Sequence, residues 1–426
     1  MKLNWCKLAI MALALGVFTA CSEDDEPNGE GPGTETGGGD DTTGGSGDNT
    51  GGEPVVSLGA YVLNTGNWGG NDAGIQFLDF QTGELSEDLY AAANGEGLGD
   101  LGQDLCVYGS KIYVTVSGSS KVVIMDRKCK VLKSIPVATE DGTPVEPRYM
   151  AACEGKVYFT AYDGTVSRID TTSMAIDGKL NLIDAGAQTG YDHPEAITSA
   201  NGKLYVNISG YSKGKWLAVV DAASFTKLKD IEVMLNPYTQ CITAEDGYVY
   251  FVSNGNYAGS PSLTPDQYIY GTMQRLDPET DQVEQVCHAT YIANAGDKMY
   301  ILYSEYYLPE VARAYVRDLK TGADSEFIDM ADLQSANGLA VDPASGDVYV
   351  FDAPYGAASD VHVYGADGTL AEVSNELWSI TDEAGSAVDT LSDGTLYELR
   401  VSVADGGAFD LSEAEKEIKI SVVLAK

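Results

Sequence analysis

Aromatic and amide side chains recur in the irregular stretches between the apolar segments of this 426-residue chain. Tyrosine and tryptophan offer a flat apolar face with a polar group, and asparagine and aspartate add amides and carboxylates beside them. This combination suits a surface that binds a large ligand with both apolar and polar parts. The candidate binding residues are Asn64, Asn67, Trp68, Asn71, Asp72, Arg148, Tyr149, Tyr162, Tyr191, Trp216, Tyr238, Asn254, Asn256, Tyr257, Tyr306 and Tyr355.

Signals for catalysis are weaker. The three histidines, His193, His288 and His362, lie far apart in the sequence, and His193 is the best candidate for a general base. No HExxH or P-loop motif occurs. Asp72 and Asp352 could bind calcium, but acidic and amide residues do not recur at a spacing that would define such a site. The sequence therefore predicts a binding protein that is not an enzyme and has no cofactor.

The candidate residues need a scaffold, and a short tyrosine-bearing strand recurs about every 48 residues. A tight turn and another apolar strand precede most copies. A third strand that usually ends in aspartate follows, and then a weaker fourth strand. This pattern predicts an all-β fold, a seven-bladed β-propeller with four-stranded antiparallel blades over residues 54–373, and no amphipathic helix. The repeated tyrosines are Tyr61, Tyr113, Tyr158, Tyr205, Tyr250, Tyr300 and Tyr349.

Two kinds of repeated residue are expected to be structural. The tyrosines occupy equivalent strands, which indicates that they pack the sheets against one another. The aspartates that end the third strands are expected to accept backbone hydrogen bonds in the following turn. These aspartates are Asp79, Asp126, Asp170, Asp221, Asp277 and Asp318.

The loops after the tyrosine strands and the loops between repeats lie on one face of a propeller. They are longer and more irregular here than the turns of the other face, including a loop at 304–313, so we predict that this face binds the ligand. The first copy lacks the strand before its turn. We expect a C-terminal strand, Leu396–Val403 or Ile418–Leu424, to close the first blade, and the rest of 374–426 to form a small β extension.

The start of the chain has the features of a lipoprotein signal peptide over residues 1–20. A basic start precedes an apolar run, Leu8–Phe18, that is too short to span a bilayer. Cys21 follows small residues, as at a bacterial lipidation site, and the acidic residues after it resemble the export signal of Bacteroidetes surface lipoproteins. Residues 21–53 are rich in Gly, Thr and acids, which predicts a flexible tether. We therefore predict a cell-surface protein held at the outer membrane by its lipid alone.

The net charge of −38 argues against nucleic acid as a partner, because an acidic surface repels phosphates. Five cysteines follow Cys21 and none forms a CxxC pair. Their apolar surroundings predict small buried side chains rather than a disulfide framework or a zinc site.

The stretch Tyr61–Ala73, which reads YVLNTGNWGGNDA, resembles the opening of the YncE-like surface lipoprotein propellers of Bacteroides. Gly99–Asp104 and Asn337–Pro343 are similar as well, so the likeness covers roughly residues 55–372, although Thr65 replaces a common glutamate. This group includes the BtuG-type proteins. The resemblance implies that the chain captures cobalamin or a related corrinoid on one propeller face. It also implies transfer to a TonB-dependent outer-membrane transporter of the BtuB type.

Two other functions are compatible with the residues. The same face could bind a ligand of another class, such as a glycan or a peptide. Alternatively, the chain could be a calcium-dependent hydrolase of the lactonase type that uses Asp72, Asp352 or His193.

Overall fold

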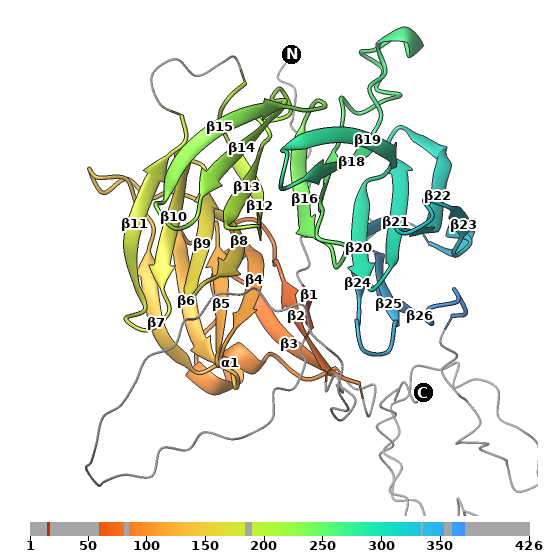
Figure 1. Ribbon diagram of the computed structural model, residues 1–426. Helices are drawn as coiled ribbons and strands as arrows, with labels where there is room; N and C mark the ends of the chain where they lie inside the picture. The colour runs from red at the N-terminus through yellow and green to blue at the C-terminus, as the bar shows by residue number, and fades with distance from the viewer. Residues whose placement is uncertain are drawn as a thin grey trace, which may run out of the picture.

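The computed structural model describes residues 59–80, 85–183, 190–333, 335–352 and 360–370, together with the backbone of 15–17. These residues form seven antiparallel sheets, numbered here in chain order, five with four strands and two with three. The protein is therefore an all-β protein of the β-propeller type, as its sequence predicts (Figure 1). No helix in this part of the chain is long and apolar enough to cross a membrane.

Each strand pairs with the next one in the chain, so every sheet is a meander. Sheet 1 contains β1 (Leu15–Val17), β2 (Gly59–Asn64) and β3 (Gly74–Asp79), and sheet 2 contains β4 (Gly102–Tyr108), β5 (Lys111–Val116), β6 (Lys121–Asp126) and β7 (Val131–Pro136). Sheet 3 contains β8 (Pro147–Cys153), β9 (Lys156–Ala161), β10 (Thr165–Asp170) and β11 (Ala175–Asn181). Sheet 4 contains β12 (Pro194–Ala200), β13 (Lys203–Ile208), β14 (Trp216–Asp221) and β15 (Thr226–Glu232).

Sheets 5 to 7 follow the same order. Sheet 5 contains β16 (Pro237–Thr243), β17 (Val249–Ser253), β18 (Thr272–Asp277) and β19 (Gln282–His288). Sheet 6 contains β20 (Tyr291–Ala295), β21 (Lys298–Glu305), β22 (Leu308–Asp318) and β23 (Asp324–Glu326). Sheet 7 contains β24 (Ala336–Val341), β25 (Val348–Asp352) and β26 (Asp360–Tyr364). The helical elements are α1 (Leu89–Asn94), η1 (Pro265–Gln267) and η2 (Met330–Asp332).

The seven repeated tyrosines are buried, which confirms that they are structural. Several of them also tie one sheet to the next. The hydroxyl of Tyr158 in sheet 3 donates to the carbonyl of Ala222 in sheet 4 at 3.3 Å, and that of Tyr205 in sheet 4 donates to Asp281 in sheet 5 at 2.8 Å. Burial of these large rings therefore stabilises the packing of neighbouring sheets.

The repeated aspartates act in the turns after the third strands, as expected. Asp126 accepts hydrogen bonds from the backbone of Lys128 and Lys130, both at 2.9 Å, and Asp170 accepts from Ser173 at 2.7 Å. Asp221, Asp277 and Asp318 make equivalent bonds. These contacts fix the geometry of the turns.

The first strands of the sheets lie toward the middle of the molecule, and the fourth strands lie outside (Figure 1). β4 contacts β8, β8 contacts β12, β12 contacts β16, and β20 contacts β24. Side-chain amides join β16 to β20, where Gln240 accepts from the backbone of Ile292 at 3.2 Å. Sheet 7 also packs on sheet 1, where Tyr349 stacks on Phe80 with ring centroids 5.4 Å apart.

Three details differ from the sequence prediction or lie beyond it. Residues 89–94 form the short helix α1, which begins at the capping side chain of Asp88. The predicted loop at 304–313 is mostly a long hairpin of β21 and β22, with Tyr306 and Tyr307 at its turn. β1, which lies within the predicted signal peptide, pairs with β2 at the edge where a closing strand was expected. The predicted C-terminal strands in 374–426 lie outside the described residues.

Candidate functional site

Irregular pairing interrupts the first strands shortly after they begin. In β4, β8, β12, β16 and β24 the register with the second strand shifts after the first residue, and among the described first strands of sheets 2 to 7 only β20 pairs without a shift. A β-bulge turns a side chain away from its regular direction, and bulges often lie next to binding sites. The residues that directly follow the first residue of these five strands are Gln103, Arg148, Glu195, Tyr238 and Asn337.

Three of these residues meet across three sheets. Nε of Arg148 lies 2.9 Å from Oε2 of Glu195, and Nη1 of Arg148 donates to Oε1 of Gln103. The hydroxyl of Tyr162 donates to Oε1 of Glu195 at 2.7 Å, and the guanidinium of Arg148 lies over the Tyr162 ring, 4.5 Å from its centroid. The side chains of Arg148 and Glu195 are only 9% and 1% exposed. We call Gln103, Arg148, Tyr162 and Glu195 the bulge cluster.

Burial dominates the electrostatics of the bulge cluster. It raises the pKa of Glu195 above its ordinary value, against the opposing effects of Arg148 and Tyr162. Burial also opposes the charge of Arg148, but Glu195 together with Tyr149, Tyr162 and Tyr238 outweighs it and raises the pKa of Arg148. The pKa values of Tyr162 and Tyr238 are raised, first by burial and then by Glu195. Arg148 therefore stays charged beside Glu195, and the phenols of Tyr162 and the neighbouring Tyr238 stay neutral.

The second strands hold the bulge cluster in place from the neighbouring sheet. Oγ1 of Thr115 donates to the carbonyl of Arg148 at 2.6 Å, and Oγ1 of Thr160 donates to the carbonyl of Glu195 at 2.8 Å. The amide of Asn207 donates to the carbonyl of Tyr238 at 3.0 Å. All three side chains are fully buried. Each of these residues thus ties its own sheet to the bulge of the next.

Some hydrogen-bonding groups in and beside the bulge cluster have no partner within the described residues. No hydrogen bond engages Nη2 of Arg148 within the described residues, and the buried hydroxyl of Tyr149 has no partner there. A guanidinium has five N–H donors, so several remain for another group. The cluster can therefore donate to an oxygen or nitrogen of a ligand that reaches it.

A chain of rings leads from the bulge cluster to the surface. The His193 ring meets the Tyr162 ring edge-on at 4.7 Å and lies 5.3 Å from the ring of Tyr211. The neighbouring hydroxyl of Ser212 lies 3.3 Å from the hydroxyl of Tyr257. The predicted candidates Arg148, Tyr149, Tyr162 and Tyr257 therefore belong to one continuous region.

Exposed aromatic side chains mark one face of the protein. Among the described residues, every exposed aromatic lies in a loop between a second and a third strand. Trp68 is 63% exposed and Tyr306 is 76% exposed. The full set is Trp68, Tyr211, Tyr257, Tyr306 and Tyr307.

The loop between β2 and β3 presents Trp68 on a rigid support. The backbone and side-chain nitrogens of Asn67 donate to the two carboxylate oxygens of Asp72 at 2.7 and 2.8 Å, and these bonds lower the pKa of Asp72. The amide of Asn64 donates to Gln76 at 2.8 Å, and Asn71 has a positive φ of 54°. Asn64, Asn67 and Asp72 therefore shape the loop, and Trp68 is the side chain that it exposes.

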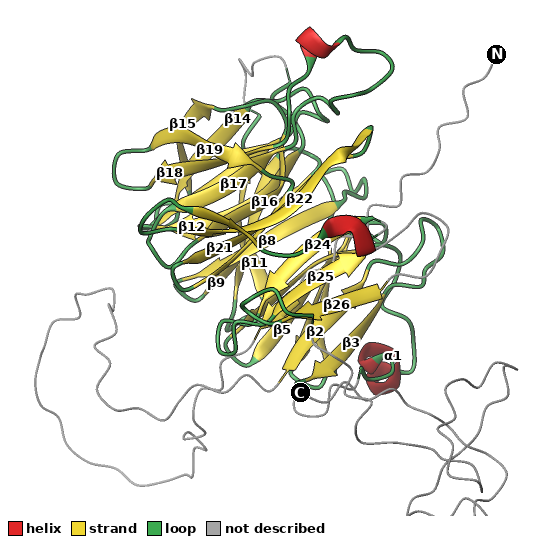
Figure 2. Ribbon diagram, turned by 90° about the vertical axis from the view of Figure 1, so that its right-hand side faces the viewer, coloured by secondary structure: helices red, strands yellow, loops and turns green. Residues whose placement is uncertain are grey.

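Among the loops between second and third strands, the loop between β17 and β18 is the longest, and the part around η1 projects from the sheets (Figure 2). Asn256 closes its base, because its amide donates to the carbonyl of Gln267 and its Oδ1 accepts from the backbone of Ile269, both at 2.9 Å. Oδ1 of Asn254 is buried without a hydrogen-bond partner in the described structure. Tyr257, which has a positive φ of 58°, is 43% exposed.

Two predicted candidates lie in the core rather than on the open face. Tyr191 is 3% exposed, its hydroxyl donates to Asp230, and Nζ of Lys227 lies 4.3 Å from its ring centroid. Trp216 belongs to the same hydrophobic cluster. The sequence could not separate these rings from the exposed ones, because both kinds follow polar loop residues. Tyr355 and Cys21 lie outside the described residues.

Glu195 and Gln103 are the site residues that sequence reasoning missed. The structure places them at the start of β4 and β12, and both are buried, so each needs a polar partner. The structure also bears on the calcium hypothesis. No group of three or more His, Cys, Asp or Glu side chains that could hold a metal occurs among the described residues.

A family model described as a domain of unknown function (DUF5074) matches residues 58–369. The chain belongs to the DUF5074 family. The DUF5074 match includes all strands from β2 to β26, and hence the bulge cluster and the exposed aromatic loops. No curated protein matches the chain.

Three solved structures are similar to this DUF5074 protein. The WD40 domain of Neurospora crassa Pan2 has 9% identity and a TM-score of 0.49, covering 72% of this chain and 86% of its own. The computationally designed Ika8 protein has 16% identity and a TM-score of 0.48, with 73% and 83% covered. Kuenenia stuttgartiensis hydrazine synthase has 15% identity and a TM-score of 0.44, with 61% and 74% covered. These values are too low to indicate a shared function.

Proposed function

We propose that this protein binds cobalamin or a related corrinoid on the face that carries the exposed aromatic loops. The observation that carries the proposal is that all exposed aromatic side chains of the described residues lie in loops of that one kind. Exposed aromatic residues gathered on one face are typical of binding surfaces, because they are costly to leave in water without a partner.

The chemistry of the face fits such a ligand. A corrin ring is broad and largely apolar, and its rim carries amide groups. Trp68, Tyr257 and Tyr306 can cover the ring, while Arg148 and Tyr149 can donate hydrogen bonds to amide oxygens. The loops are braced by hydrogen bonds such as Asn67–Asp72, so binding needs little ordering of the protein.

We further infer that the seven sheets are the blades of one closed propeller. The contacts of β4, β8, β12 and β16 and the packing of sheet 7 on sheet 1 support this arrangement. In a closed ring the loops after the second strands surround the central axis. The bulge residues of the first strands would then line the mouth of the channel below them.

The proposal includes the location of the protein. A lipid on Cys21 and the acidic tether after it would hold the binding face outside the cell, beside a TonB-dependent transporter that receives the ligand. The sequence supports this through the apolar run before Cys21 and the residues after it. Replacement of Cys21 by serine should abolish labelling with a palmitate analogue and release the protein from the membrane fraction.

Titration of the purified protein with cyanocobalamin tests the binding proposal. We expect saturable heat and a change in the corrin absorbance at micromolar ligand, and at least tenfold weaker binding by Trp68→Ala and Tyr257→Ala. Leu132→Ala, which changes an exposed side chain on the outer strand β7, is the matched control and should bind normally.

Absence of any signal at micromolar cyanocobalamin would reject the corrinoid. Binding of a glycan or a peptide that is lost in Trp68→Ala would then assign the face to another ligand class. Hydrolysis of a lactone that stops on chelation of calcium would point instead to the hydrolase.

A further inference from the structure

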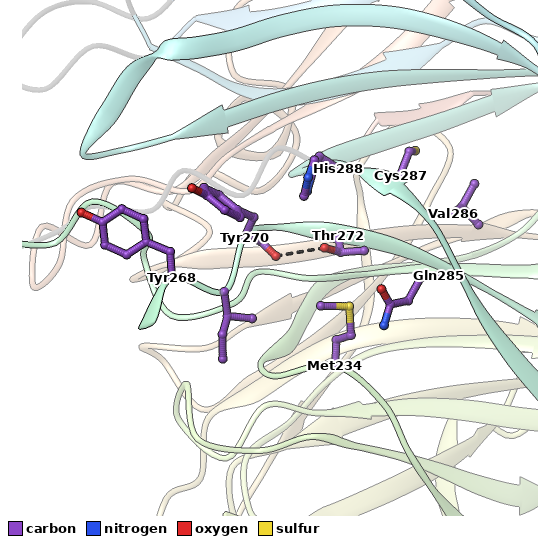
Figure 3. Close-up of a pocket in the computed structure, with 9 residues that line it drawn as sticks. Met234, Tyr268, Tyr270, Thr272, Gln285, Val286, Cys287 and His288 are labelled. Carbon is purple, nitrogen blue, oxygen red and sulfur yellow. Dashed lines mark hydrogen bonds between the residues drawn. The ribbon is translucent and has the colours of Figure 1, made fainter. Parts of the chain in front are cut away.

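A pocket of about 420 Å³ lies at the edge of sheet 5, and none of the predicted binding residues lines it. Met234, which follows β15, forms its floor in Figure 3, and Tyr268 and Tyr270 enter from the loop before β18. Thr272 begins β18 and His288 ends β19, so the pocket opens at the same end of the sheet as the loops after the second strands.

Aromatic rings hold the His288 side chain in one orientation. The imidazole stacks on the ring of Tyr303 with centroids 5.2 Å apart and meets the ring of Tyr270 nearly edge-on at 5.4 Å. The Tyr268 ring stands almost perpendicular to that of Tyr270, at 6.1 Å. Rings arranged in this way favour a further flat ring, because offset and edge-on contacts are the stable ones.

The imidazole presents a hydrogen-bond acceptor. Nδ1 of His288 lies 3.3 Å from the carbonyl oxygen of Gly271, which can only accept, so the neutral ring carries its proton on Nδ1. Nε2 then keeps its lone pair, and no hydrogen bond engages it within the described residues. A ligand in the pocket that donates an N–H would find a partner there.

The walls of the pocket exclude charge. Its lining residues include Met234, Ile269 and Val286 but no Asp, Glu, Lys or Arg. A charged ligand would lose hydration there without gaining a counter-charge, which is unfavourable. The nearby carboxylate of Glu305 is already bound to the backbone nitrogen of Gly271 at 2.7 Å.

We propose that this pocket binds a neutral, planar heteroaromatic ring that donates an N–H to Nε2 of His288. Tyr268 and Tyr270 form its aromatic walls, and Met234 provides a polarisable surface beneath the ring. The inference does not depend on the ligand proposed for the exposed loops, because its residues and its probe are different.

Indole and 1-methylindole test the proposal, since the second lacks the N–H. Both are titrated into the purified protein and into His288→Phe, which keeps a ring between the tyrosines but removes the acceptor. One hydrogen bond changes affinity by about fivefold, so the preference for indole over 1-methylindole should fall by that factor in His288→Phe. Tyr270→Ala should weaken binding of both probes about tenfold through loss of a wall.

Leu132→Ser, on the outer strand of sheet 2, is the control and should bind both probes normally. Thermal unfolding of each variant shows whether it is folded. If Tyr270→Ala does not fold, Tyr270→Leu takes its place. The proposal is overturned if indole does not bind at millimolar concentration, if His288→Phe keeps the full preference, or if benzamidinium, a cation of similar size, binds as well as indole. Cyanocobalamin is titrated separately, so either proposal can fail alone.

Discussion

Replacing Glu195 with glutamine tests whether the bulge cluster is as buried and as interdependent as its geometry indicates. The carboxylate lies 2.9 Å from Nε of Arg148 and 2.7 Å from the hydroxyl of Tyr162. The substitution keeps the shape of the side chain but leaves the guanidinium without its counter-charge. Breaking a buried ion pair on one side costs about 3–5 kcal/mol. We expect about 3 kcal/mol, because the amide oxygen of glutamine can still accept one hydrogen bond.

Urea denaturation followed by intrinsic fluorescence measures this loss. With an m-value of about 3 kcal/mol/M, the midpoint should fall by about 1 M. Arg148→Met should cost a similar amount, because Glu195 is then the unpaired charge. The double variant removes both charges, so its loss should be smaller than the sum of the single losses by about 2 kcal/mol or more.

The same chemical change at an exposed pair provides the control. Lys215 and Glu232 form an ion pair whose side chains are 48% and 60% exposed. Glu232→Gln should change the free energy of unfolding by less than about 1 kcal/mol. If Glu195→Gln is as mild as Glu232→Gln and shows no coupling to Arg148→Met, the cluster is hydrated and our account of the site is refuted.

Three further predictions follow from individual contacts. Thr160→Val removes the donor to the Glu195 carbonyl and should lower the free energy of unfolding by about 1–3 kcal/mol in urea, whereas an effect within error would show that water replaces the hydroxyl. Burial raises the pKa of Asp104 from 3.8 to about 6, so the folded state binds its proton more tightly than the unfolded state does. The free energy of unfolding should therefore fall by up to about 3 kcal/mol as the pH rises from about 4 to 6, and Asp104→Asn should remove that part of the pH dependence. Trp68→Ala should leave the thermal midpoint unchanged, because the ring is exposed; a large drop would mean that Trp68 supports the loop instead of a ligand.

Much of the scaffold could be read from local sequence. Strand alternation and turn residues act over a few positions, so the strands and the hairpins that join them are predictable. The roles of Tyr158 and Asp126 also followed, because a residue repeated at the same place in each unit must serve the unit itself. The α1 helix was missed, since six residues carry too little periodicity, and its start depends on the single capping side chain of Asp88.

The candidate site was predictable only in part. The sequence pointed to Trp68 and Tyr257 as loop aromatics, and both are exposed. It also pointed to Tyr191 and Trp216, which the structure buries. A ring near a polar loop looks the same in sequence whether it faces solvent or the neighbouring sheet, because burial depends on contacts with residues distant in the chain.

The sequence by itself determined the repeat and the antiparallel strands, since these depend on local patterns. Only the tertiary structure decided that Arg148 meets Glu195. Those residues are far apart in the chain, and each is turned toward the other by an irregularity in strand pairing. A bulge arises from how two strands align, and the meeting of two bulges arises from how two sheets pack. Neither can be predicted from the residues around one position.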